Sequence, residues 1–138
     1  MYTIFIEHLE KSTTNNPIAY RYRAFRFWEK IIKWSITRAS FYEVRLWEDD
    51  LKEINSIEML GDLQINTETE EIVFAGKVNE NIEYKLLSRY LTEDNHIKYF
   101  TVEFKNESDY IFSNLSHYGD EIILDVKDIE EARMVKKA

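Results

Sequence analysis

The chain has 138 residues, of which 44% are hydrophobic and 14% aromatic, and its formal net charge is −8. This length and apolar share suit a single domain over 1–138 with a hydrophobic core of its own. The sequence contains no cysteine, so disulfides, cysteine-based catalysis and iron–sulfur clusters are excluded. The acidic balance argues against nucleic acid as a partner and favours a basic protein surface.

The charge is divided unevenly along the chain. Residues 1–47 carry eight Lys and Arg against four Glu, and residues 48–138 carry ten against twenty-two Asp and Glu. No apolar run approaches the roughly 18 residues of a membrane span, and the first residues lack the basic start of a signal peptide. We therefore expect a cytoplasmic protein with no membrane span. Its bias towards Ile, Asn and Lys is associated with AT-rich bacterial or phage genes.

The first predicted elements are a strand and a long helix. Alternating apolar and polar residues predict a strand over 1–8. Asn16 then suits a helix N-cap, and Pro17 suits the first helical position because it lacks the donor that would be orphaned there. Polar residues recur every three or four positions, which predicts a long amphipathic helix over about 17–38. Its basic stripe consists of Arg23, Arg26, Lys30 and Lys33.

The rest of the chain predicts several shorter elements. Alternation favours a strand over 41–47, while 48–60 stays open between a short helix and a strand. The later expectations are a hairpin of 63–66 with 71–74, a helix over 81–91, a strand over 96–105, a short helix over 108–118, a strand over 121–126 and a helix from Asp128 to about 137. Without a regular strand–helix–strand rhythm, this mixture predicts an α+β fold. We expect a mostly antiparallel sheet packed on the long N-terminal helix plus shorter helices.

The sequence shows no catalytic or metal-binding pattern. The three histidines are too far apart for a helical metal pair, and the three glycines are isolated, which argues against a phosphate-binding loop. We therefore expect no catalytic residue, no metal and no cofactor.

One near-match concerns metal-dependent nucleases. Glu103 and Lys105 with Asp94 upstream resemble the acidic and basic signature of that superfamily. An extended chain would separate Asp94 from Glu103 by about 30 Å, which is too far for a shared metal unless another acid, such as Glu71 or Asp120, replaces Asp94. The competing interpretation is an exposed Glu–Lys pair on the solvent face.

Acidic residues gather directly after the predicted strand over 41–47. An aromatic residue beside a cluster of charges has the composition of a protein–protein interface, although a half-buried strand aromatic has the same sequence pattern. The predicted partner-binding residues are Trp47, Glu48, Asp49, Asp50 and Glu53.

These observations favour a non-enzymatic binding protein. The leading hypothesis is an immunity- or antitoxin-type inhibitor that occludes a basic toxin surface, for example that of a nuclease. A phage or mobile-element accessory protein that blocks a host factor or sequesters a small ligand is the alternative, and a metal-dependent nuclease is a third class. The basic stripe stays open between phosphate contact, an anionic membrane and a plain solvent face.

Overall fold

The structure is a computed structural model that describes residues 2–7, 17–52, 62–66, 68–92 and 96–136. Side chains are described over 2–7, 25–50, 68–92 and 96–135. Within the described chain, the strands are β1 (Tyr2–Glu7), β2 (Phe41–Trp47), β3 (Asp62–Asn66), β4 (Glu71–Lys77), β5 (Thr101–Lys105), β6 (Ile111–Ser116) and β7 (Glu121–Val126). The helices are α1 (Pro17–Ile36), α2 (Ile82–Leu87) and α3 (Ile129–Lys136), and η1 (Glu48–Lys52) is a 3-10 helix. This composition confirms the α+β class.

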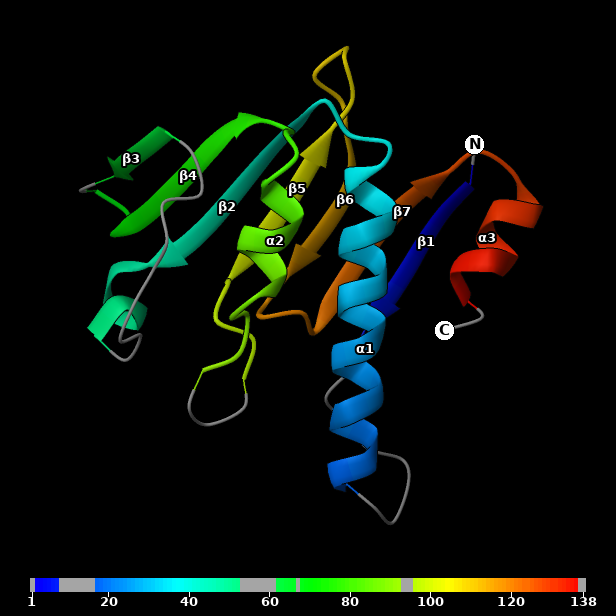
Figure 1. Ribbon diagram of the computed structural model, residues 1–138, viewed down its shortest axis with the longest axis horizontal. Coiled ribbons are helices and arrows are strands. Elements are labelled where there is room, and N and C mark those ends of the chain that lie inside the picture. The colour runs from blue at the N-terminus through cyan, green and yellow to red at the C-terminus, as the bar shows by residue number, and fades with distance from the viewer. Residues whose placement is uncertain (1, 8–16, 53–61, 67, 93–95, 137–138) are drawn as a thin grey trace.

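The described strands form one antiparallel sheet in the order β1-β7-β6-β5-β2-β4-β3 (Figure 1). The first strand pairs with the last, and Tyr2 lies opposite Val126. In the centre, β2 pairs with β4 on one side and β5 on the other. The predicted strands over 41–47 and 121–126 and the hairpin of β3 with β4 are confirmed.

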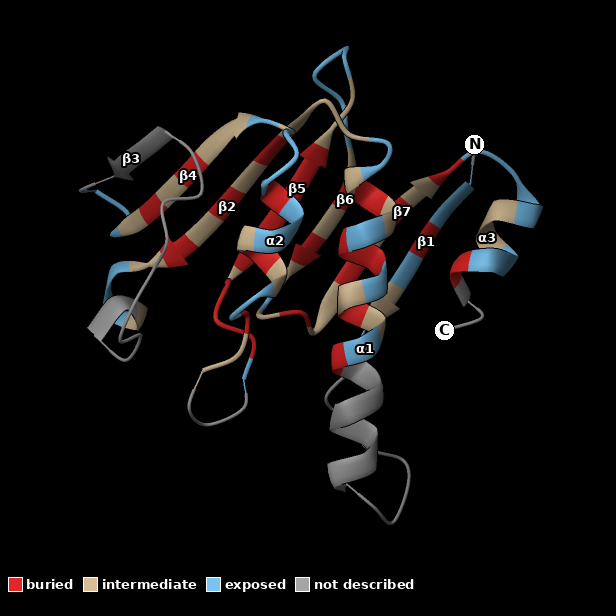
Figure 2. Cartoon of the chain, in the orientation of Figure 1, coloured by how far each residue is buried: buried red, intermediate tan, exposed pale blue. Residues whose placement is uncertain are grey.

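Helices α1 and α2 lie on the same face of the sheet, and the buried residues lie between them and the strands (Figures 1 and 2). Strand β2 alternates strictly, and its buried residues Tyr42, Val44 and Leu46 point to this face. From α1, the Trp28 ring stacks with the rings of Tyr90 and Tyr99 at centroid distances of 5.0 and 6.2 Å. No described helix lies against the opposite face, which is called the open face below.

The predicted long amphipathic helix over about 17–38, on which the sheet was expected to pack, is corrected by the structure. α1 ends at Ile36, because the Thr37 hydroxyl and the Arg38 guanidinium both donate to the Trp34 carbonyl, at 2.8 and 3.0 Å. The buried side chains that α1 is seen to place against the sheet, Phe25, Trp28, Ile31, Ile32 and Ser35, lie within 25–36, a segment shorter than the predicted 17–38. The described sheet is therefore covered by this segment and two short helices.

Two further expectations were wrong. The helix predicted over 108–118 is strand β6, and the helix predicted over 81–91 is only α2. Asn106 starts a turn before β6, because its Oδ1 accepts hydrogen bonds from the amides of Ser108 and Tyr110 at 2.9 and 3.1 Å. Pairing with β5 and β7 then sets the conformation of 111–116, in which polar Ser113 occupies a buried position, so the sequence lacks the apolar alternation that identifies a strand.

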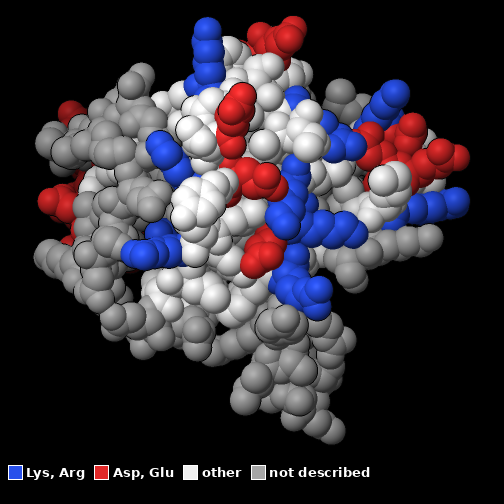
Figure 3. Space-filling view, viewed as in Figure 1, with Lys and Arg blue, Asp and Glu red and all other residues white. Residues whose placement is uncertain are grey.

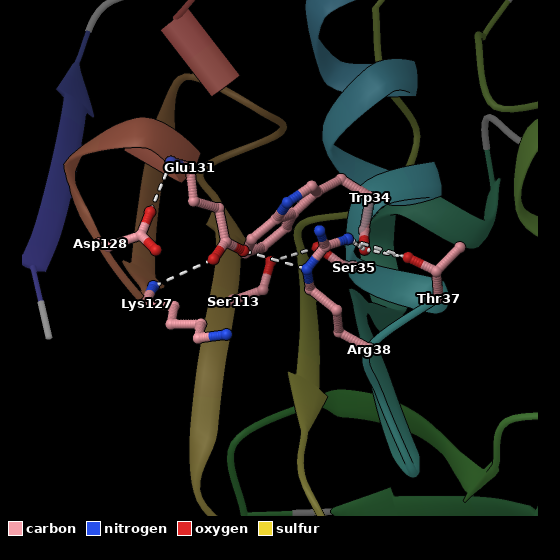
Figure 4. Close-up of polar contacts among 8 residues, drawn as sticks. All are labelled: Trp34, Ser35, Thr37, Arg38, Ser113, Lys127, Asp128 and Glu131. Carbon is pink, nitrogen blue, oxygen red and sulfur yellow. Dashed lines mark hydrogen bonds and ion pairs between the residues drawn. The ribbon is translucent and has the colours of Figure 1, made fainter. Parts of the chain in front are cut away.

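The C-terminal helix is tied to the end of α1 by a chain of polar contacts (Figure 4). Asp128 caps α3 as predicted, because its Oδ1 accepts from the Glu131 amide at 2.8 Å. Glu131 accepts from the Lys127 amide at 3.1 Å and from Arg38 Nε at 3.0 Å. Arg38 also stacks 4.5 Å above the Trp34 ring. These contacts hold α3 beside α1 at the β1 end of the sheet.

Candidate functional site

The predicted interaction residues lie where β2 passes into η1. Trp47 is the last residue of β2 and is half-buried, while Glu48 and Asp49 are exposed at the start of η1. The Glu48 amide donates to the Glu70 carbonyl at 2.8 Å, which fixes the direction in which the chain leaves the strand. Glu53, the remaining predicted residue, lies outside the described residues.

Aromatic side chains from two distant segments surround this strand end. The ring of Trp47 contacts Phe100 at a centroid distance of 5.0 Å. Phe100 in turn meets the edges of His117 and Tyr118 at 5.4 and 5.2 Å. The Tyr118 hydroxyl donates to Asp50 Oδ2 at 2.7 Å, so the aromatic cluster connects back to the acidic turn. We name the set of Trp47, Glu48, Asp49, Asp50, Phe100, His117 and Tyr118 the acidic aromatic corner.

The turn that supplies His117 and Tyr118 has an unusual backbone. Three residues in succession have positive φ: His117 at 52°, Tyr118 at 58° and Gly119 at 84°. A non-glycine residue in this region costs roughly 1–2 kcal/mol, and such strain is concentrated at functional sites. Gly119 is buried, and a Cβ there would lie 2.9 Å from Cδ1 of Trp28. The core thus anchors the turn at Gly119, while the side chains of His117 and Tyr118, which precede Gly119, face Phe100.

Sequence reasoning did not find Phe100, His117 or Tyr118. Residues 100 and 117–118 are remote from 47–50 along the chain, and they meet only through the order of β2, β5 and β6 in the sheet. The single local signal was Gly119, whose place between two strands marks a turn. His117 is exposed, with Nε2 3.4 Å from Glu121 Oε2.

The structure corrects the competing interpretation of the nuclease near-match, in which Glu103 and Lys105 form an exposed pair. Glu103 was expected as an exposed partner of Lys105, but it is only 8% exposed, because β2 and β6 flank it on both sides. Lys105 instead lies 3.6 Å from Asp109. Asp94 is outside the described residues. In the described parts of the chain, no group of three or more His, Asp or Glu could hold a metal ion.

The basic stripe lies on the outer side of α1. Arg26, Lys30 and Lys33 are exposed, while the side chain of Arg23 is outside the described set. Lys and Arg gather over α1 on this side of the molecule, with Asp and Glu close beside them (Figure 3). Lys30 Nζ also reaches the Met134 carbonyl of α3 at 3.4 Å. The stripe is therefore a mixed charged surface rather than an uninterrupted basic one.

Among the described residues, no helix combines the length and apolarity that a membrane crossing requires. No protein-family model matches the sequence, and neither the curated proteins nor the solved structures include a significant match to it.

Proposed function

We propose that this chain is a non-enzymatic binding protein whose acidic aromatic corner docks onto a basic surface of another protein, in the manner of an immunity- or antitoxin-type inhibitor. The observation that carries the proposal is the hydrogen bond from Tyr118 to Asp50, which joins the aromatic cluster around Trp47 to the acidic turn. An aromatic anchor and a set of carboxylates are thereby held on one surface.

The arrangement has the physical properties of an interface. Tryptophan and tyrosine are enriched among residues that dominate binding energy, because they bury a large area at low entropic cost. The exposed carboxylates of Glu48 and Asp49 would attract a basic partner and raise its association rate. Contacts with Phe100 and Tyr118 order the corner before binding, which lowers the entropic cost of association.

A cross-linking experiment identifies the partner and its position together. We would place a photoreactive amino acid at Trp47 and, as a control, at Tyr84, which is 71% exposed on α2. The proposal expects the position-47 variant to capture one basic protein from the native host and the position-84 variant not to capture it. Equal capture from both positions, or a captured protein without a basic surface, would contradict the proposal.

Charge variants then test the energetics with the captured protein. We expect E48Q/D49N to weaken its binding about tenfold, mainly through slower association, and to reduce the dependence on salt. The matched control E80Q/E83Q removes two exposed carboxylates beside α2 and should leave affinity within about twofold. Similar losses in both double variants would show that only total charge matters.

The alternative function, sequestration of a small ligand, is supported by one groove. It has a volume of about 480 Å³, and its lining includes Phe41, Lys77 and Lys105 together with two carboxylates, Glu43 and Asp109. The sheet register places the two lysines on either side of Phe41, an arrangement that suits a flat ring carrying an anionic group. A rise in melting temperature with adenosine monophosphate that K77Q abolishes would favour this function, whereas no shift would oppose it.

A further inference from the structure

Two glutamates lie directly opposite each other in the middle of the sheet. The register pairs Glu43 of β2 with Glu103 of β5, and both face the open side of the sheet. Like charges in this position normally destabilise a sheet. Glu103 is only 8% exposed and the Glu43 side chain only 20%, so water screens their repulsion poorly. The repulsion between the two carboxylates must therefore be offset by another interaction.

The opposed positions of the two side chains bear on whether one of the carboxyls holds a proton. Residues directly opposite each other in an antiparallel pair have Cβ atoms about 4.5–5.5 Å apart, so the carboxyls of Glu43 and Glu103 are within reach of a hydrogen bond to each other. An ionised carboxylate can only accept hydrogen bonds, so this bond exists only when one of the two carboxyls carries a proton. Two carboxylates this close and this poorly screened do not both ionise readily, so we expect the pair to hold one proton between them.

Arg45 indicates which residue is neutral. Its Nη2 and Nε donate to Glu43 Oε2 at 2.7 and 3.2 Å, and a cation so close favours the ionised form of Glu43. Nη1 of Arg45 lies 3.7 Å from Glu71 Oε2 on β4. Glu43 is thus the acceptor, and Glu103 is the acid that donates.

The surroundings of Glu103 agree with this assignment. Burial raises the pKa of Glu103 above its ordinary value of 4.5, and the charge of Glu43 and its hydrogen bond act in the same direction. Arg45 and Lys105 oppose the shift. The β6 residue opposite Glu103 is Asn114, whose Oδ1 is buried and has no hydrogen-bond partner among the described residues. Strand β6 carries no charged residue.

We propose that Glu103 acts as a pH-sensitive clasp, which donates its carboxyl hydrogen to Glu43, joins β5 to β2, and releases this bond when rising pH removes the proton. The device is independent of docking at the acidic aromatic corner. Because the folded chain holds this proton more tightly than the unfolded chain, the stabilisation is fully present below about pH 4.5, the ordinary pKa that the carboxyl has in the unfolded chain, and is lost as the pH rises through the higher pKa of the folded chain.

Urea unfolding as a function of pH tests the clasp. E103Q keeps a neutral donor opposite Glu43 at every pH, and the control E107Q removes one carboxylate from an exposed position just beyond β5. Starting from pH 4.5, we expect wild type to lose stability relative to E103Q with a slope of up to about tenfold in the folding equilibrium constant per pH unit. E107Q should follow wild type. A wild-type to E103Q difference that does not change with pH would overturn the proposal.

A second measurement covers the case in which E103Q fails to fold. Carbon-13 NMR of the glutamate side-chain carboxyls in the wild-type protein should show one signal, assigned to Glu103, that titrates above the range of the other glutamates. The same signal should persist in E107Q. If the Glu103 carboxyl titrates together with the exposed glutamates, no proton is held between the strands and the clasp does not exist.

Discussion

Gly119→Ala is the sharpest test of how the acidic aromatic corner is anchored. An added Cβ at this position would lie 2.6 Å from Cδ1 of Ile97 and 2.9 Å from Cδ1 of Trp28. The Ile97 methyl lies at the far end of a flexible side chain, but the Trp28 ring is buried and stacks with Tyr90 and Tyr99, so moving it would disturb the core. Overpacking of this kind costs about 1–3 kcal/mol. The φ of 84° adds about 1 kcal/mol for a residue with a side chain, so we expect a loss of about 2–4 kcal/mol.

Urea unfolding monitored by tryptophan fluorescence measures this loss. Gly76→Ala is the matched control, because its Cβ would lie 3.1 Å from the Tyr42 hydroxyl and 3.4 Å from Cζ of that ring, with no contact under 3.0 Å and no positive φ. We expect G76A to cost less than about 1 kcal/mol, in line with substitutions that need little rearrangement. If G119A stays within about 0.5 kcal/mol of wild type, the described packing of the turn against Trp28 is wrong.

Two further predictions concern the junctions of α1 and α3. Ser35 and Ser113 share a buried 2.7 Å hydrogen bond, so S35A should cost about 1–3 kcal/mol by leaving Ser113 without a partner, while S35A/S113A should cost less than the two single variants together. A double-mutant cycle from urea unfolding checks this, and strict additivity would contradict it. Asp128→Ala removes the N-cap of α3 and should cost about 1 kcal/mol, with faster amide exchange at Glu131. Unchanged exchange at Glu131 would count against the cap.

The strands were predictable wherever one face is buried and the other is not. In β2 and β7 the side chains alternate strictly between buried and half-buried positions, and that alternation is written directly in the sequence. Strand β6 was not predictable in this way. Its turn depends on the side chain of Asn106, and polar Ser113 occupies one of its buried positions, so the sequence shows no apolar alternation and tertiary pairing decides the conformation.

The candidate site was predictable only in its local part. Trp47 and the acids that follow it are adjacent in the sequence, and their composition indicated an interface. Phe100 and Tyr118 join them through strand order, which no local pattern specifies. Glu103 was expected to be exposed on the solvent face, but it is buried, because β2 and β6 lie on either side of it. The face of a strand on which a residue lies can be predicted from its neighbours in the sequence, whereas its burial within the sheet depends on which strands lie beside it.

The pairing of β1 with β7 has a consequence for folding. Every hydrogen-bonded neighbour of β1 in the described sheet belongs to β7, more than a hundred positions later, as the pair Tyr2 and Val126 shows. During synthesis the chain emerges from its amino end, so β1 must wait without a partner until 121–126 have left the ribosome. Contacts this distant also slow folding, because a large loop must close before they form. Closure of this edge is therefore expected to be a late event in folding, after the central strands have assembled.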